Sequence, residues 1–72
     1  MLSVNLAKVV ATLSNMVIVC TDRIGDLGLE MNKSYTILSA WQIEEYTEKI
    51  KHYKLLKQDA EEAIKLCDSY LT

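Results

Sequence analysis

Apolar residues in the first half of the chain recur at alternating intervals of three and four positions. Two series with a seven-residue spacing produce this pattern: Leu6, Leu13, Cys20 and Leu27, and Val10, Val17, Ile24 and Met31. Such a heptad places both series along one side of a helix, where they pack against another helix. The pattern predicts a helix over residues 3–32 that begins at the N-cap Ser3.

Two glycines, Gly25 and Gly28, lie inside this predicted helix. Each costs about 1 kcal/mol relative to alanine in a helix interior, and together they are also compatible with a turn. The heptad nevertheless continues in register through both glycines to Met31. We therefore expect an unbroken or slightly kinked helix, with a break at the glycines as the alternative.

A second helix is predicted to begin at Ser39. Ser39 and Gln42 fit a capping box, in which the glutamine side chain reaches back to the amide of the cap residue. Leu38 and Ile43 occupy the positions of a hydrophobic staple. These signals predict a turn over residues 33–38.

The second helix is expected to cover residues 39–71. Its predicted seam consists of Ile43, Tyr46, Ile50, Tyr53, Lys57, Ala60, Ile64, Cys67 and Leu71, widened by Leu56, Ala63 and Tyr70. Two arms of similar length joined by a short turn pack against each other. The predicted fold class is therefore all-α: one domain over residues 1–72 that forms an antiparallel, coiled-coil-like two-helix hairpin.

The first helix is apolar around most of its circumference, since Val9, Met16 and Ile18 lie outside the heptad seam. A helix of this kind is buried by more than one neighbour. A chain of 72 residues is also near the lower limit for a self-sufficient core. We therefore expect oligomerisation or a partner protein to complete the hairpin.

The residues predicted to contact the partner combine the seam with the remaining apolar surface. They are Val9, Val10, Leu13, Met16, Val17, Ile18, Cys20, Ile24, Leu27, Trp41, Tyr46 and Tyr53. The two tyrosines are expected to close the hairpin. Trp41 has two interpretations, an interface anchor or a side chain folded over the turn.

Composition narrows the classes of partner. The net charge is −2, and the lysines between Lys49 and Lys57 are bracketed by acidic residues, which argues against nucleic acid or an anionic membrane surface. The uncharged run Val9–Thr21 is shorter than the roughly 20 residues that span a bilayer, and it lacks the basic start of a signal peptide. We expect a cytoplasmic protein.

No catalytic or cofactor-binding constellation is evident in the sequence. His52 lies on the outward side of the second helix without a nucleophile or cleft to serve. Cys20 and Cys67 have no metal-ligand or redox spacing, and in an antiparallel hairpin they are too far apart to bridge. We expect free thiols, no metal, no cofactor and no enzymatic activity.

The end of the second helix resembles one protein family. Residues Gln58–Leu71 read QDAEEAIKLCDSYL, which is similar to the family's ending of alanine, acid, alanine-isoleucine, apolar residues and a tyrosine. The family comprises the small co-chaperones that, with a larger helical-repeat chaperone, hold the needle subunit of type III secretion systems in the bacterial cytosol. The resemblance implies a virulence-associated chaperone role through helix packing against the larger chaperone, the secreted subunit or both. The alternative from the pattern alone is a homodimeric four-helix bundle that serves as a regulator or scaffold.

Overall fold

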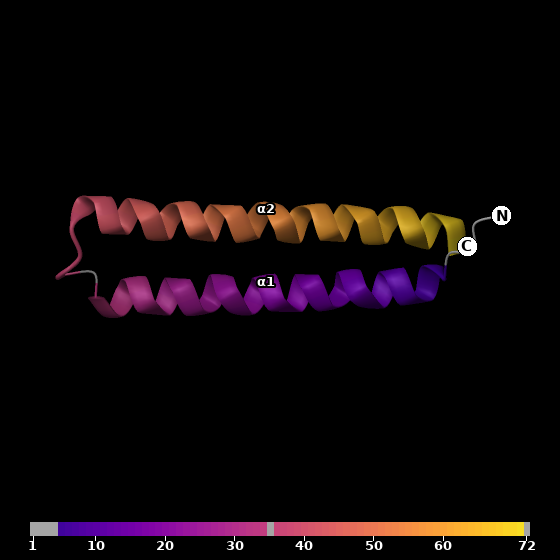
Figure 1. Cartoon of the computed structure of the whole chain (residues 1–72), viewed down its shortest axis with the longest axis horizontal. Coiled ribbons are helices and arrows are strands. Elements are labelled where there is room, and N and C mark those ends of the chain that lie inside the picture. Colours follow the sequence, from indigo (N-terminus) through magenta and orange to yellow (C-terminus); the bar gives the residue numbers. More distant parts are fainter. Residues whose placement is uncertain (1–4, 35, 72) are drawn as a thin grey trace.

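The computed structural model is described for residues 5–34 and 36–71, and it shows a two-helix hairpin. Helix α1 covers Leu6–Ser34 and helix α2 covers Ala40–Leu71. The helices run side by side in opposite directions, so that the start of α1 lies near the end of α2 (Figure 1). The molecule measures 56 × 19 × 16 Å, and the described segments contain no strand. The all-α hairpin expected from the sequence is confirmed.

Helix α1 begins at a different cap from the one predicted. The amide of Lys8 donates a hydrogen bond of 3.1 Å to Oδ1 of Asn5, and the amide of Val9 donates to the carbonyl of Asn5 at 3.1 Å. Asn5 is therefore the N-cap, because its side chain satisfies an amide of the first turn that has no partner within the helix. The predicted cap, Ser3, lies outside the described residues.

Helix α1 ends at Ser34, slightly beyond the predicted end at residue 32. No glycine or proline follows Met31 to stop the helix earlier. The amides of Ile37 and Leu38 both donate to the carbonyl of Ser34 at 2.9 Å, which closes the last turn and starts the loop.

Helix α2 begins at the predicted cap. The amide of Ser39 donates to Oε1 of Gln42 at 2.9 Å, as the capping box requires. The amide of Ile43 donates to the carbonyl of Ser39 at 3.1 Å, which is the first backbone bond of the helix. This part of the sequence prediction is confirmed.

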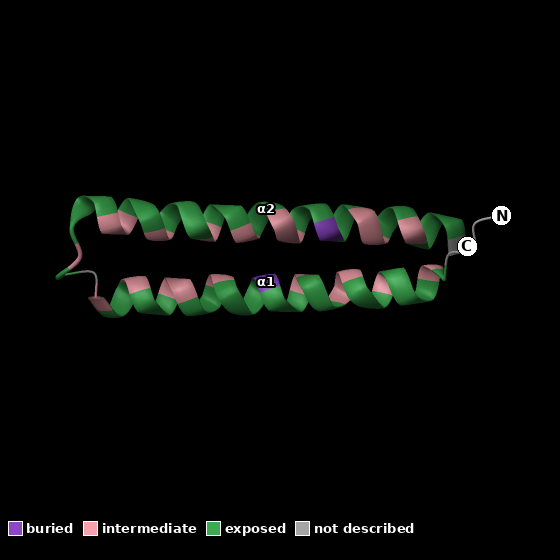
Figure 2. Cartoon of the chain, viewed as in Figure 1, coloured by how far each residue is buried: buried purple, intermediate pink, exposed green. Residues whose placement is uncertain are grey.

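Burial follows the predicted heptads on both helices (Figure 2). On α1 the half-buried residues are Leu6, Val10, Leu13, Ser14, Val17, Ile24, Leu27, Gly28, Met31 and Ser34. On α2 they are Gln42, Ile43, Tyr46, Ile50, Tyr53, Leu56, Lys57, Ala63, Ile64 and Cys67. Only Cys20, 5% exposed, and Ala60, 3% exposed, are buried among the described hydrophobic side chains. The side chain of Leu71 lies outside the described part.

The structure corrects one assignment in the seam of α2. Tyr70 was predicted to widen the seam, but its side chain is 81% exposed. It lies three residues beyond Cys67, at the end of the hairpin where α1 begins at Leu6 and gives it little cover. Tyr70 therefore belongs to the surface of the hairpin.

The two glycines do not interrupt α1, which is continuous from Leu6 to Ser34. Neither glycine adopts a positive φ. A Cβ atom added at Gly25 or Gly28 would meet no atom within 4 Å outside its own helical turn. The alternative of a turn at the glycines is wrong, and the space beside both positions is open.

Candidate interaction surface

Most of the predicted contact residues lie in the seam, where α1 and α2 pack against each other. They are Val10, Leu13, Val17, Cys20, Ile24 and Leu27 on α1, and Tyr46 and Tyr53 on α2. All are half-buried except Cys20, which is buried. These side chains hold the hairpin together, so that only their outer edges are available to a partner. Partner contact by these residues stays a prediction.

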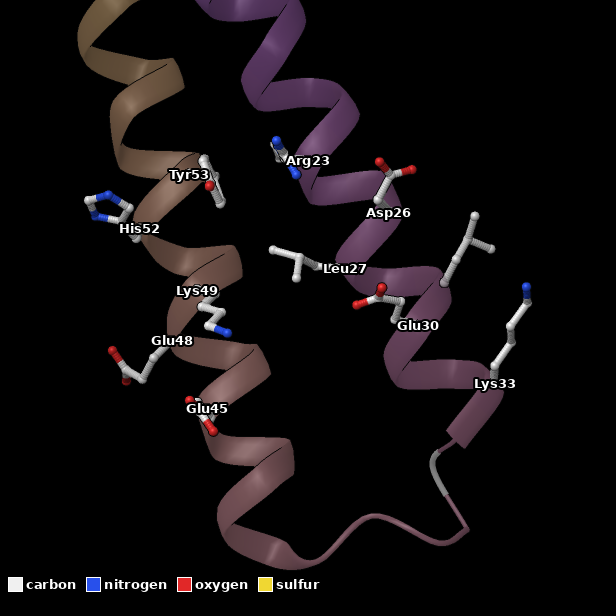
Figure 3. A pocket seen from close by; sticks show the side chains of 11 residues that line it. Arg23, Asp26, Leu27, Glu30, Lys33, Glu45, Glu48, Lys49, His52 and Tyr53 are labelled. Carbon is white, nitrogen blue, oxygen red and sulfur yellow. The ribbon is translucent and has the colours of Figure 1, made fainter.

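One side of the seam carries a groove near the loop (Figure 3). We call it the charged groove. It is lined by Arg23, Asp26, Leu27, Leu29, Glu30 and Lys33 of α1 and by Glu45, Glu48, Lys49, His52 and Tyr53 of α2. Both helices contribute acidic and basic side chains to this groove, so neither helix presents a single sign of charge to a partner.

The same side of the hairpin is mostly apolar toward the other end, with Thr12 and Asp59 as its exposed polar residues. Residues seven positions apart lie on one flank of a helix in a coiled coil. The row that carries Arg23 in the charged groove therefore continues toward the start of α1 as Met16 and Val9. The row that carries Asp26 continues in the same direction as Val19. On α2 the corresponding rows run from His52 through the exposed Asp59 to Leu66, and from Lys49 to Tyr70. We call the resulting set the terminal patch: Val9, Met16, Val19, Leu66 and Tyr70, all exposed.

A second groove lies on the opposite side of the seam. It is lined by Ser14, Val17 and Ile18 of α1 and by Glu61, Ile64 and Lys65 of α2. Ile18 is exposed here, so it does not share a face with Met16 although both were predicted to contact a partner. The predicted contact residues are therefore divided between two sides of the hairpin.

Trp41 lies on neither side. Its ring is 65% exposed, and it lines a shallow depression with Glu44, Glu45 and Glu48. Leu55 follows Trp41 by two heptads and is exposed in the same way. Of the two interpretations of Trp41, the side chain folded over the turn is wrong.

Part of the terminal patch was not predicted from the sequence. Val19, Leu66 and Tyr70 were not selected as contact residues, yet they are exposed beside Val9 and Met16. A signal was present for Val19, because it follows Met16 at the three-residue spacing that places two side chains on one flank of a helix. The contribution of α2 depends on how the two helices are aligned, and the sequence of one helix does not give that alignment.

The sequence drew attention to three groups with chemical reactivity, which are Cys20, Cys67 and His52. Cys20 and Cys67 are free thiols, as expected. His52 is exposed on α2, and its ring makes an edge-type contact with the neighbouring Tyr53 ring at a centroid distance of 5.7 Å. Within residues 5–34 and 36–71, no group of three or more His, Cys, Asp or Glu side chains is placed to hold a metal ion. No helix in this described part has the length and apolar character needed to cross a membrane.

The hairpin exposes more surface than a compact protein of its size. Its accessible surface is 5806 Å², whereas a compact folded chain of 8.2 kDa exposes about 4,500 Å². The surplus of about 1,300 Å² arises because two helices give each other only one neighbour.

Comparison of the chain with known protein families, curated proteins and solved structures finds no match. The class of protein is therefore defined by its own geometry, as an all-α antiparallel hairpin with exposed apolar surface.

Proposed function

We propose that the chain is a non-enzymatic protein-interaction module whose apolar surface is covered by another protein chain. The observation that supports this function is the imbalance between its core and its surface. Two hydrophobic residues are buried in the described part, Cys20 and Ala60, while large side chains such as Met16, Val19 and Leu66 are exposed. Contiguous apolar patches of this kind mark interaction sites in proteins that are otherwise monomeric.

We further propose that its cellular role is that of a small cytoplasmic co-chaperone for the needle subunit of a type III secretion system. The support is the resemblance of Gln58–Leu71 to that family, together with the hairpin architecture. In this segment Ala60, Ile64 and Cys67 lie in the seam, so the resembling residues hold α2 against α1. The surface left exposed would then pack against a larger helical-repeat chaperone or the secreted subunit.

Co-expression tests this role directly. The chain is produced with a helical-repeat needle chaperone and its needle subunit, and the mixture is separated by size exclusion. The proposal expects all three proteins in one peak and no needle polymer. Met16→Glu should remove the chain from the complex, whereas the matched control Asn15→Glu, exposed outside the terminal patch, should remain in it. Elution of the unmodified chain alone, with polymerisation unchanged, would contradict the co-chaperone role.

The second candidate is a homodimeric four-helix bundle that acts as a regulator or scaffold. The observation that favours it is the presence of both signs of charge on both helices of the charged groove, since such a surface can complement a second copy of itself. A stable dimer at low concentration would favour this candidate, and a dissociated chain that folds only with another protein would favour the co-chaperone.

A further inference from the structure

We propose that a second copy of this chain docks on the side of the hairpin formed by the terminal patch and the charged groove, with the loops of both copies at the same end. This inference rests on the proposed function as an interaction module, and it names the surface and its occupant. The second copy occupies the surface in the absence of any other partner.

The first argument is the distribution of apolar and charged residues along this side. The half nearest the start of α1 carries Val9, Met16 and Val19, and the half nearest the loop carries the charged groove. A second copy turned end for end over the whole side would press charged side chains against the apolar half, and burial of an unpaired charge is strongly unfavourable. In the arrangement with both loops at one end, Asp59 is the only charged residue on the described rows of this side that meets the apolar half, so the cost is smaller.

The second argument is charge complementarity in that arrangement. A two-fold axis parallel to the helices places α1 of one copy over α2 of the other, in the same antiparallel alignment that the two helices have within one hairpin. Glu30 and Lys49 lie on opposite helices of the charged groove (Figure 3). Glu30 of each copy then approaches Lys49 of the other, and the symmetry forms this pair twice.

The third argument is the area available. A standard protein interface removes about 800 Å² from each partner. The surplus of about 1,300 Å² over a compact chain exceeds this requirement. The hairpin therefore has enough surplus surface for a contact of standard size with a second copy, and such a contact would remove more than half of the surplus.

Sedimentation equilibrium of the purified chain tests the docking surface. We expect a dimer, and Met16→Glu should raise its dissociation constant by about a hundredfold, because the new carboxylate is buried against apolar side chains. Val19→Glu should raise the dissociation constant of the dimer to a similar extent, as an independent test at a second position of the patch. Asn15→Glu should change the constant by no more than about twofold, as is usual for an exposed residue outside a contact. Circular dichroism checks that each variant keeps its helix content.

A mixing experiment tests the orientation. Glu30→Lys and Lys49→Glu should each weaken the dimer, since each variant places like charges opposite one another in both copies. An equal mixture of the two variants should restore association, because every pair across the interface is then opposite in sign. Pairs within each hairpin are the same before and after mixing, so restored association reports only contacts between copies.

Three outcomes would overturn the inference. They are a monomer at every concentration, equal effects of Met16→Glu and Asn15→Glu on the dimer, and no restored association in the mixture. The interaction module is tested separately by co-expression. If the isolated chain is a monomer but still enters the co-expressed complex through Met16, the dimer inference is wrong and the proposed function stands. If the chain is a dimer that no larger protein joins, the co-chaperone role is contradicted and the dimer inference stands.

Discussion

The amide of Ser39 and the side chain of Gln42 are joined by a hydrogen bond of 2.9 Å at the first turn of α2. The hydroxyl of Ser39 also donates to Oε1 of Gln42, at 3.1 Å. The same glutamine oxygen therefore accepts both bonds and fixes the residue at which the loop ends. Because the loop sets how α2 is aligned along α1, this local pair contributes to the register of the whole seam.

Replacement of Gln42 by alanine should lower the free energy of unfolding by about 1 kcal/mol, because the amide of Ser39 loses its acceptor. Gln58→Ala is the matched control, since Gln58 is an exposed glutamine on the same helix. Urea unfolding, monitored by circular dichroism at one fixed protein concentration, measures the free energy of unfolding of both variants. Equal effects of the two substitutions would show that the cap contributes nothing to stability.

Alanine at either glycine of α1 should stabilise the hairpin. Gly25→Ala and Gly28→Ala should each raise the free energy of unfolding by about 1 kcal/mol, because alanine lowers the entropy of the unfolded chain and meets no atom within 4 Å. Thermal unfolding measures the gain. A loss of stability at Gly28 with a gain at Gly25 would indicate that another chain approaches closely at Gly28.

Lys57 is a half-buried basic residue within the seam. Lys57→Leu should raise the free energy of unfolding by about 1 kcal/mol, because an apolar side chain replaces a charged one between the two helices. Lys54→Leu provides the control, since Lys54 is exposed on the same helix. If both substitutions have the same effect in urea unfolding, Lys57 does not act as a seam residue.

The two thiols should differ in reactivity in the folded chain. Cys20 is buried and Cys67 is half-buried, so a thiol-specific reagent should modify Cys67 about tenfold faster, because reaction at Cys20 requires local opening. The Cys67→Ala and Cys20→Ala variants allow each rate to be measured alone by absorbance. Both rates should become equal in denaturant, and equal rates in the folded state would contradict the burial of Cys20.

The elements that local spacing determines were predictable from the sequence. The heptad of α1 gave the residues that face α2, and Ser39 with Gln42 gave the start of α2. These features depend on periodicity and on hydrogen bonds between near neighbours, which are encoded over a few residues.

The features that depend on the second helix were not predictable in the same way. The exposure of Tyr70 depends on how far α1 extends beside it. The exposure of Trp41 depends on whether the loop folds back over its ring. The grouping of Met16 with Leu66 also requires the alignment of α1 with α2. Asn5 differs from these cases: as a preferred N-cap residue near the start of α1 it had a local signal, but Ser3 had the same signal and the spacing did not separate them.

The loop joins the two helices at one end only, and at the other end the start of α1 and the end of α2 lie near each other without a connecting segment (Figure 1). Separation of the helices therefore begins at this unjoined end, and the amides there should exchange with solvent sooner than those next to the loop. The terminal patch extends from the same end to Val19, near the middle of α1. A protein bound to the patch would hold the two helices together at this end. It would therefore slow amide hydrogen exchange most strongly where the free hairpin opens first.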